Sequence, residues 1–298
     1  MRLIFFFLVF SIGFVCFGQT HLQGKVVNSE TALGVPFATV TYKNEKGHRV
    51  IYTDSVGKFS IKNALSGIKI SCVGYETISY GIKNGNDDIT IKLLPVSVQL
   101  QSVVINAKPK KRIRLGYFKD QELTGPVGFG NYVGPSGERA NYVAQFVPNK
   151  TGDSALLITK LLYNLLNDVT LVNRSKLTLA TNCTTNRLRV HLFTRDKKKG
   201  CPDVELLTRN IVFKNDCSIN NLIIDISNEN IYLPKDGVFV GLEYVDDLKT
   251  SNRSFPYYIV FNSPNNSCYF SYHQQNWGQY QYSYKQKIGA RFGIEVIR

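Results

Sequence analysis

Apolar and polar residues alternate with a period of two over short stretches that begin at His21, and turn residues separate one stretch from the next. This alternation is typical of β-strands with one buried face, and the first hundred residues keep no helical period. Asn84-Gly85, between the sixth and seventh stretches, is a typical hairpin sequence. The pattern predicts strands at residues 22–27, 38–42, 50–53, 58–61, 68–72, 78–81, 89–93 and 103–106.

The same pattern continues in the second half of the chain. Along one of its stretches, the leucine and valine residues are expected to face a core, and Arg187, Arg189 and His191 to face water. Residues 155–166 are so rich in leucine that they fit a buried strand or a buried helix, and the β-rich surroundings favour a strand. Strands are predicted at 142–147, 176–181, 187–194, 210–213, 222–225, 238–244, 257–261, 268–273 and 280–285, with a last one near Ile294.

Residues 1–18 have the features of an export signal. Arg2 is followed by fifteen almost entirely apolar residues, 3–17, and then by Gly18. This run is shorter than the roughly 20 residues of a transmembrane helix, so it predicts a cleaved signal peptide. The mature chain is expected in the periplasm, at the periphery of the outer membrane, or outside the cell. It keeps Cys72 and four further cysteines whose disulfide pairing the sequence leaves open, namely Cys183, Cys201, Cys217 and Cys268.

Charge divides the chain. The net charge is +14, from 36 Lys and Arg against 22 Asp and Glu, and the 43% of hydrophobic residues exclude a disordered protein. The densest basic run consists of Lys108, Lys110, Lys111, Arg112 and Arg114. An exported protein is not expected to bind nucleic acid, so the run is interpreted as a solvated linker, or as a contact with anionic envelope lipids or glycans. With the Gly- and Pro-rich residues that follow, it predicts a linker at 108–139 between domains at 19–107 and 140–298.

Four short sequences resemble the successive motifs of the carboxypeptidase-regulatory-like domain: residues 24–27 (GKVV), 34–40 (GVPFATV), 53–59 (TDSVGKF) and 71–75 (SCVGY). The resemblance implies a prealbumin-type β-sandwich over residues 21–107, of a kind common in exported proteins of Bacteroidota and often found ahead of outer-membrane transporters. Residues 202–243 resemble part of a jelly-roll-like segment of Bacteroidota envelope proteins. The predicted fold is therefore all-β, with a prealbumin-like N-terminal β-sandwich and a larger jelly-roll-like C-terminal one.

Sequence motifs for hydrolysis are missing from the chain. It contains no His-x-x-Glu pair, no His-Glu-x-x-His and no Gly-x-Ser-x-Gly, so neither a zinc carboxypeptidase nor a serine hydrolase is expected. No cofactor and no metal site are predicted. Asp246-Asp247, close to Glu243, is interpreted as a solvated turn. A hydrolase that uses Asp246, Glu243 or a histidine is the alternative, and a cleft that joins two titratable side chains within hydrogen-bond reach would favour it.

Aromatic and amide residues are concentrated at 269–284. Aromatic rings stack on the apolar faces of sugars and amides bond their hydroxyls, so this patch is either a tyrosine-covered sandwich face or a glycan- or peptide-binding surface. In the second case Tyr272, Trp277 and Tyr280 are the expected anchors. The sequence as a whole predicts an exported, non-catalytic cell-envelope protein that acts by binding, as an accessory to outer-membrane uptake or surface display; a glycan-binding module is the narrower alternative.

Overall fold

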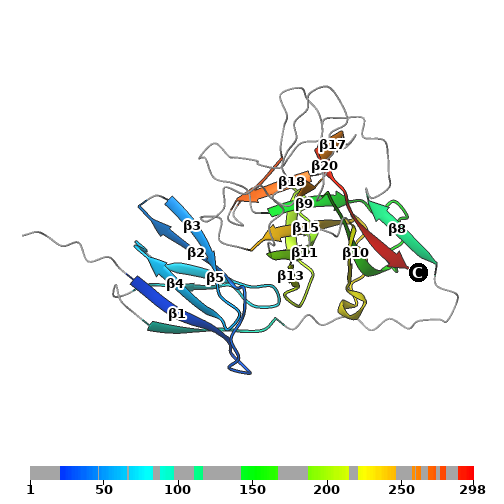
Figure 1. The fold of residues 1–298 in the computed structure, drawn as a ribbon. Coiled ribbons are helices and arrows are strands. Elements are labelled where there is room, and N and C mark those ends of the chain that lie inside the picture. Colours follow the sequence, from blue (N-terminus) through cyan, green and yellow to red (C-terminus); the bar gives the residue numbers. More distant parts are fainter. Residues whose placement is uncertain are drawn as a thin grey trace, which may run out of the picture.

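The computed structural model describes residues 21–45, 47–65, 67–82, 88–96, 111–116, 142–166, 187–214, 221–245, 257–258, 260–262, 268–272, 276–279 and 288–298. Regular structure in these ranges is β-strand, apart from one turn of 3-10 helix, η1 (Ser227–Glu229). The prediction of an all-β protein is confirmed. Figure 1 shows the strands gathered in two sandwiches, which we call the first sandwich (residues 21–96) and the second sandwich (residues 111–298).

The first sandwich packs two sheets around an apolar core. One sheet has the order β4-β1-β7, with β1 and β7 parallel, and the other has the order β3-β2-β5-β6. Alternation along β4 buries Phe59 and Ile61 and exposes their neighbours, as the period-two pattern predicts. The strands are β1 (His21–Asn28), β2 (Thr39–Asn44), β3 (Gly47–Tyr52), β4 (Lys58–Lys62), β5 (Ile68–Ser71), β6 (Ile78–Tyr80) and β7 (Asp88–Leu93).

The hairpin predicted at Asn84-Gly85 is wrong. β6 pairs with β5, whereas β7 pairs with β1 in the opposite sheet. The buried side chains of Ile89, Ile91 and Leu93 fill the core beside β1, so the chain crosses from one sheet to the other between β6 and β7. Residues 83–87 themselves, like the predicted strand at 103–106, lie outside the described residues.

The second sandwich is larger. Its sheets have the orders β14-β10-β21-β8, with β16 paired to β10, and β12-β11-β15-β9-β18-β19, with β13 paired to β11; β17 and β20 form a short pair. The strands are β8 (Arg112–Gly116), β9 (Tyr142–Val147), β10 (Leu157–Leu166), β11 (Arg187–Arg195), β12 (Pro202–Glu205), β13 (Val212–Lys214), β14 (Asn221–Asp225), β15 (Val238–Tyr244), β16 (Tyr257–Tyr258), β17 (Val260–Asn262), β18 (Cys268–Tyr272), β19 (Asn276–Gln279), β20 (Ile288–Ala290) and β21 (Phe292–Ile297).

The leucine-rich segment is a strand, as preferred from the sequence. β10 lies between β14 and β21, and Leu161 and Leu162, which point to opposite faces, are only 0% and 5% exposed. A strand buried on both faces needs a continuous apolar run rather than an alternation, which explains why its sequence could also fit a helix. The predicted strands at 176–181 and 280–285 lie outside the described residues.

Part of the predicted linker is regular structure. Arg112–Gly116 form β8, which pairs antiparallel with β21 at the edge of its sheet. Ile113 and Leu115 pack against the core, and the Nε of Arg114 lies 3.2 Å from the Oε2 of Glu295. Residues 112–116, predicted as part of a linker, are therefore an edge strand instead, and their cations alternate with apolar residues as an edge strand requires. Lys108 and Lys110 lie outside the described residues.

The two sandwiches contact each other directly. Val73, in the loop at residues 72–75 of the first sandwich, belongs to the apolar core of the second. The side-chain amide of Asn210 donates to the carbonyl oxygen of Pro36 at 3.1 Å. Figure 1 shows the first sandwich beside the sheet that contains β11, β15 and β9. This junction positions the candidate site.

Among the described residues, no helix is long and apolar enough to cross a membrane. The predicted signal peptide, residues 1–18, lies outside the described part of the chain.

Candidate functional site

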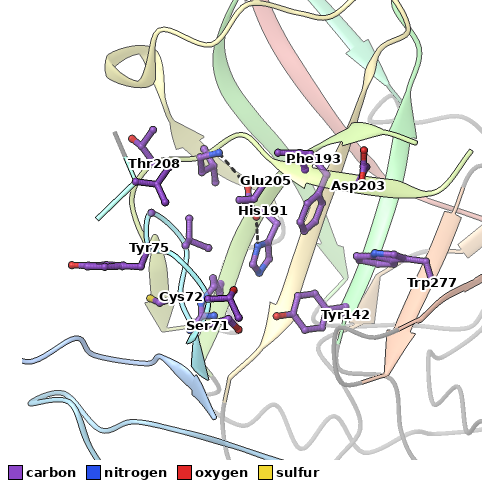
Figure 2. Close-up of a pocket in the computed structure, with 17 residues that line it drawn as sticks. Ser71, Cys72, Tyr75, Tyr142, His191, Phe193, Asp203, Glu205, Thr208 and Trp277 are labelled. Carbon is purple, nitrogen blue, oxygen red and sulfur yellow. Dashed lines mark hydrogen bonds and ion pairs between the residues drawn. The ribbon is translucent and has the colours of Figure 1, made fainter. Parts of the chain in front are cut away.

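A cavity of about 430 Å³ opens where the two sandwiches meet. The first sandwich contributes the 72–75 loop, with Ser71 and Val96; the second contributes side chains from β9, β11, β12 and β19. Figure 2 shows Ser71, Cys72 and Tyr75 to one side of His191 and Trp277 to the other. Its size is within the about 300–1,000 Å³ typical of small-molecule sites.

The strand register places three residues that line the cavity, Trp277, Tyr142 and Arg189, in one row with Ser271 and Glu243. Trp277 pairs with Ser271, Ser271 with Tyr142, Tyr142 with Glu243, and Glu243 with Arg189. Directly paired residues share one face of a sheet, so the row runs across five strands on the side away from the main core. Gly241, which pairs with His191, leaves the space that the His191 and Phe193 side chains occupy.

The expectation that Arg189 and His191 face water is wrong. They are 1% and 3% exposed, because the first sandwich and the neighbouring residues of the second cover this face of β11. Of the three residues expected to face water, only Arg187 is exposed, and its guanidinium lies 5.2 Å from the centre of the Phe37 ring of the first sandwich. β11 is therefore buried on both faces where it meets the first sandwich.

Glu243 is the centre of a buried polar network. Its Oε2 lies 3.0 Å from the Nη1 of Arg189 and 3.1 Å from the Nε2 of His191. Its Oε1 accepts a hydrogen bond of 3.0 Å from the Tyr52 hydroxyl of the first sandwich, and the Tyr142 hydroxyl also bonds the carboxylate. Burial alone would raise the pKa of Glu243, but Arg189 and His191 hold it below its usual value. The fully buried carboxylate is thus ionised and paired.

Arg189 joins the network to the first sandwich a second time. It donates to the hydroxyl of Thr39 at 3.3 Å and to the carbonyl oxygen of Phe37. The Tyr52 ring lies under its guanidinium, 5.9 Å from centroid to Cζ. These contacts and the Tyr52–Glu243 bond fasten the two sandwiches together.

His191 lies between two carboxylates. Its Nδ1 is 2.6 Å from the Oε2 of Glu205, opposite the Glu243 contact at Nε2. Ionised carboxylates only accept hydrogen bonds, so the imidazolium, with two N–H groups, is the form that satisfies both. Burial disfavours the charged ring, yet Glu205 and Glu243 raise the pKa of His191 above its ordinary value. Glu205 is fixed in turn, because its Oε1 accepts the backbone N–H groups of Leu192 and Leu207 at 2.9 and 3.2 Å.

The raised pKa of His191 predicts a pH-dependent stability. The folded protein holds this proton to a higher pH than the unfolded chain, in which the pKa is about 6.5. The contribution is complete below that value and is lost as the pH rises through the higher folded pKa. Urea unfolding of the wild type should show this decline as the pH rises above about 6.5, and His191→Gln should remove it. His48→Gln, at an exposed position, should leave the decline unchanged; a decline that persists in His191→Gln would contradict the assignment.

Aromatic rings form one wall of the cavity. Phe193 stacks on His191 with ring centres 5.2 Å apart, and Trp277 lies edge-on to Phe193 and Tyr142 at 5.6 and 6.0 Å. The Trp277 side chain is only partly buried. At the rim, Val96 of the first sandwich and Val204 of the second are 42% and 58% exposed, and Asp203 beside Val204 is exposed as well. The cavity therefore joins apolar and aromatic surface to carboxylates.

Of the three anchors expected from the sequence, the structure places one at this cavity. Trp277 lines it. Tyr272 is the last residue of β18, but its side chain lies outside the described residues, and so does the whole of Tyr280. Asp246 and Asp247, the residues of the predicted solvated turn, also lie outside them. Sequence reasoning missed Arg189, His191 and Glu205. The one feature of the sequence that could have pointed to them is that Arg189 and His191 share a strand face. The sequence does not show which residues cover that face.

Among the described residues, three cysteines form no disulfide: Cys72, Cys201 and Cys268. Cys72 lines the cavity, and burial raises its pKa to about 11, so the thiol stays protonated at neutral pH. Cys183 and Cys217 lie outside the described residues, and their pairing stays open. Within the described ranges, no three His, Cys, Asp or Glu side chains are arranged to hold a metal ion.

Comparison with known proteins identifies one segment of the chain. Residues 22–105 match the family model of the CarboxypepD_reg-like domain, which confirms the resemblance seen in the sequence motifs. A search of curated proteins gives no significant match.

Solved structures give only weak likenesses. A protein provisionally described as carbohydrate-binding, from Bacteroides uniformis, is 8% identical over 81% of this chain and 98% of its own, with a TM-score of 0.22. A DUF3823 family protein from Parabacteroides merdae is 10% identical over 76% and 98%, with a TM-score of 0.21. The Bacillus anthracis TIE protein is 11% identical over 77% and 48%, with a TM-score of 0.22. Likenesses at this level establish neither a common fold nor a function.

Proposed function

We propose that the protein is an exported, non-catalytic component of the cell envelope that binds a saccharide in the cavity between its two sandwiches. The observation that carries this proposal is the partly exposed ring of Trp277 in a cavity that also presents Asp203 and Glu205. An aromatic ring stacks on the apolar face of a sugar, and carboxylate oxygens accept hydrogen bonds from its hydroxyls. The exposed valines at the rim add apolar surface on both sides.

A hydrolase is the second candidate, because the cavity does join titratable side chains within hydrogen-bond reach. The engagement of these groups argues against catalysis. Glu243 is fully buried and bonds four donors, and carboxylates occupy both ring nitrogens of His191. A general base needs a lone pair free to take a proton from water or substrate, and neither group offers one. We expect bound oligosaccharides to be recovered intact after prolonged incubation; shorter products that disappear with Glu205→Gln would instead support the hydrolase.

The envelope location rests on the N-terminal segment. The proposed signal peptide at 1–18 and the family match at 22–105 support export and a role beside an uptake or surface-display system. The basic run adds a peripheral contact with anionic lipids or glycans, because Arg112 and Arg114 expose their side chains along the edge strand β8. Fractionation of cells that express the full chain tests this location.

Trp277→Ala is expected to weaken saccharide binding at least about tenfold, equivalent to about 1.4 kcal/mol, because it removes the stacking surface. Binding is measured on a glycan array and then by calorimetry. Trp277→Phe, which keeps a ring, should lose less. Tyr80→Ala, in β6 of the first sandwich and outside the lining of the cavity, is the control and should bind as the wild type does. Equal binding by Trp277→Ala and the wild type would contradict the site.

A further inference from the structure

Glu205 offers the cavity a carboxylate in a fixed orientation. Its side chain is 21% exposed, whereas that of Glu243 is fully buried. A carboxylate has about four acceptor sites. Oε1 of Glu205 accepts two backbone N–H groups, from Leu192 and Leu207, and Oε2 accepts the Nδ1–H of His191. Within the described part of the chain, Oε2 therefore keeps one site for a donor from a ligand.

The orientation of that remaining site depends on His191. The imidazolium donates at both nitrogens, over 2.6 Å to Glu205 and over 3.1 Å to Glu243. A neutral imidazole has one N–H and one lone pair, so it can donate to only one of the two carboxylates. Glu243 is 0% exposed and cannot turn toward water, so the N–H stays with Glu243. Loss of the proton therefore places a lone pair against Glu205, which can swing into the cavity.

His191 is the group of this cluster that changes its charge near neutral pH. Burial raises the pKa of Cys72 to about 11 and that of Tyr142 above its usual value, so both stay neutral. Burial opposes the charge of Glu243, but Arg189 and His191 keep its pKa low, so this carboxylate stays ionised. The charged and titratable groups that surround His191 are Arg189 on the same strand, Asp203 and Glu205 on β12, Glu243 on β15, Tyr142 on β9 and Cys72 in the 72–75 loop.

We propose that Glu205 selects one hydroxyl group of the bound saccharide, and that the imidazolium of His191 is the positioning group that holds Glu205 for it. The inference rests on the proposed function and adds its regulation: the saccharide binds while His191 is protonated and is released as the pH rises. Because the ligand favours the protonated form, its binding must in turn strengthen the hold of His191 on the proton. Trp277 does not titrate, so its stacking on the sugar stays constant over the same pH range.

The test measures binding to the full chain by calorimetry at about pH 6 and about pH 9. The probes are tetrasaccharides of the cello-, xylo-, malto- and N-acetylated chito- series, which carry no charge themselves. In the series that binds, we expect the affinity to fall at least about tenfold between the two pH values, as the loss of one hydrogen bond to a charged group predicts. Between them, binding should take up protons, which makes the measured enthalpy depend on the buffer. Circular dichroism at each pH verifies that the chain is folded.

His191→Gln should bind weakly at both pH values and take up no protons. His48→Gln, at an exposed position of the first sandwich, is the matched control and should keep the wild-type profile. Trp277→Ala should weaken binding at both pH values and keep the decline between them.

The wild-type profile decides the question even if His191→Gln fails to fold. Equal wild-type affinities at both pH values, or the same proton uptake by His191→Gln as by the wild type, would overturn the inference and leave the proposed function intact. Failure of every series to bind the wild type at either pH would overturn both.

Discussion

Replacing Glu243 by alanine is expected to lower the free energy of unfolding by about 3–5 kcal/mol, the cost typical of removing one partner from a buried ion pair. The substitution leaves the guanidinium of Arg189, which is 1% exposed, and the imidazolium of His191 without the carboxylate between them. It also removes one of the two acceptors of the Tyr52 hydroxyl, and with it one of the bonds between the two sandwiches; the carbonyl oxygen of Tyr244 remains as the other acceptor. Urea unfolding followed by circular dichroism measures the change.

Two further variants make this result specific. Glu243→Gln keeps the shape of the side chain and one acceptor oxygen but not the charge, so its loss should be smaller. Glu30→Ala removes an exposed carboxylate from the first sandwich and should change the stability by no more than about 0.5 kcal/mol. If Glu243→Ala were as stable as Glu30→Ala, Glu243 would not be the centre of a structural network.

Gly74→Ala is the second substitution with a large expected effect, about 2–5 kcal/mol. Gly74 has φ +81°, a conformation that costs an L-residue roughly 1–2 kcal/mol. A Cβ at this position would also lie far inside van der Waals contact with the carbonyl oxygen of Thr208, in the second sandwich, and overpacking of this kind costs about 1–3 kcal/mol. Because the Thr208 oxygen belongs to the backbone, it cannot move away as a side chain could. The two sandwiches must therefore shift apart to remove the clash.

Gly47→Ala separates the two contributions. Gly47 has φ +103°, but nothing lies within 4 Å of its added Cβ, so this variant measures the backbone strain alone. The difference between the two variants reports the contact between the sandwiches. A loss in Gly74→Ala no larger than that in Gly47→Ala would mean that the sandwiches do not pack through this loop in solution.

Local patterns predicted the strands well and their partners poorly. Alternation located β4 and β7 almost to the residue, because the burial of one face can be read from the strand's own sequence. The partner of a strand is decided by residues far away in the chain, so the Asn84-Gly85 turn suggested a hairpin where the structure has a crossover. At 112–116, the high density of cations favoured a linker, although cations and apolar residues alternate there as they do in β8.

The site was harder to predict than the fold. Trp277 could be predicted because a tryptophan among amide side chains points to sugar recognition by its chemistry alone. Arg189 and His191 were assigned to a wet face, since a strand sequence shows which residues share a face but not whether a second domain covers it. The Arg189–Glu243 pair depends on the register of β11 and β15, which are separated by more than forty residues in the chain.

The chain contains a single tryptophan beside 17 tyrosines, so emission excited at a wavelength that tryptophan alone absorbs reports on the proposed site. The most direct test is a titration of the wild type with the oligosaccharide selected on the glycan array, with emission and calorimetry followed on the same samples. Binding in the cavity buries the partly exposed Trp277 ring against a sugar, so we expect a saturable change in emission with the dissociation constant that calorimetry gives. Saturable binding that leaves the Trp277 emission unchanged would place the ligand elsewhere and contradict the central claim.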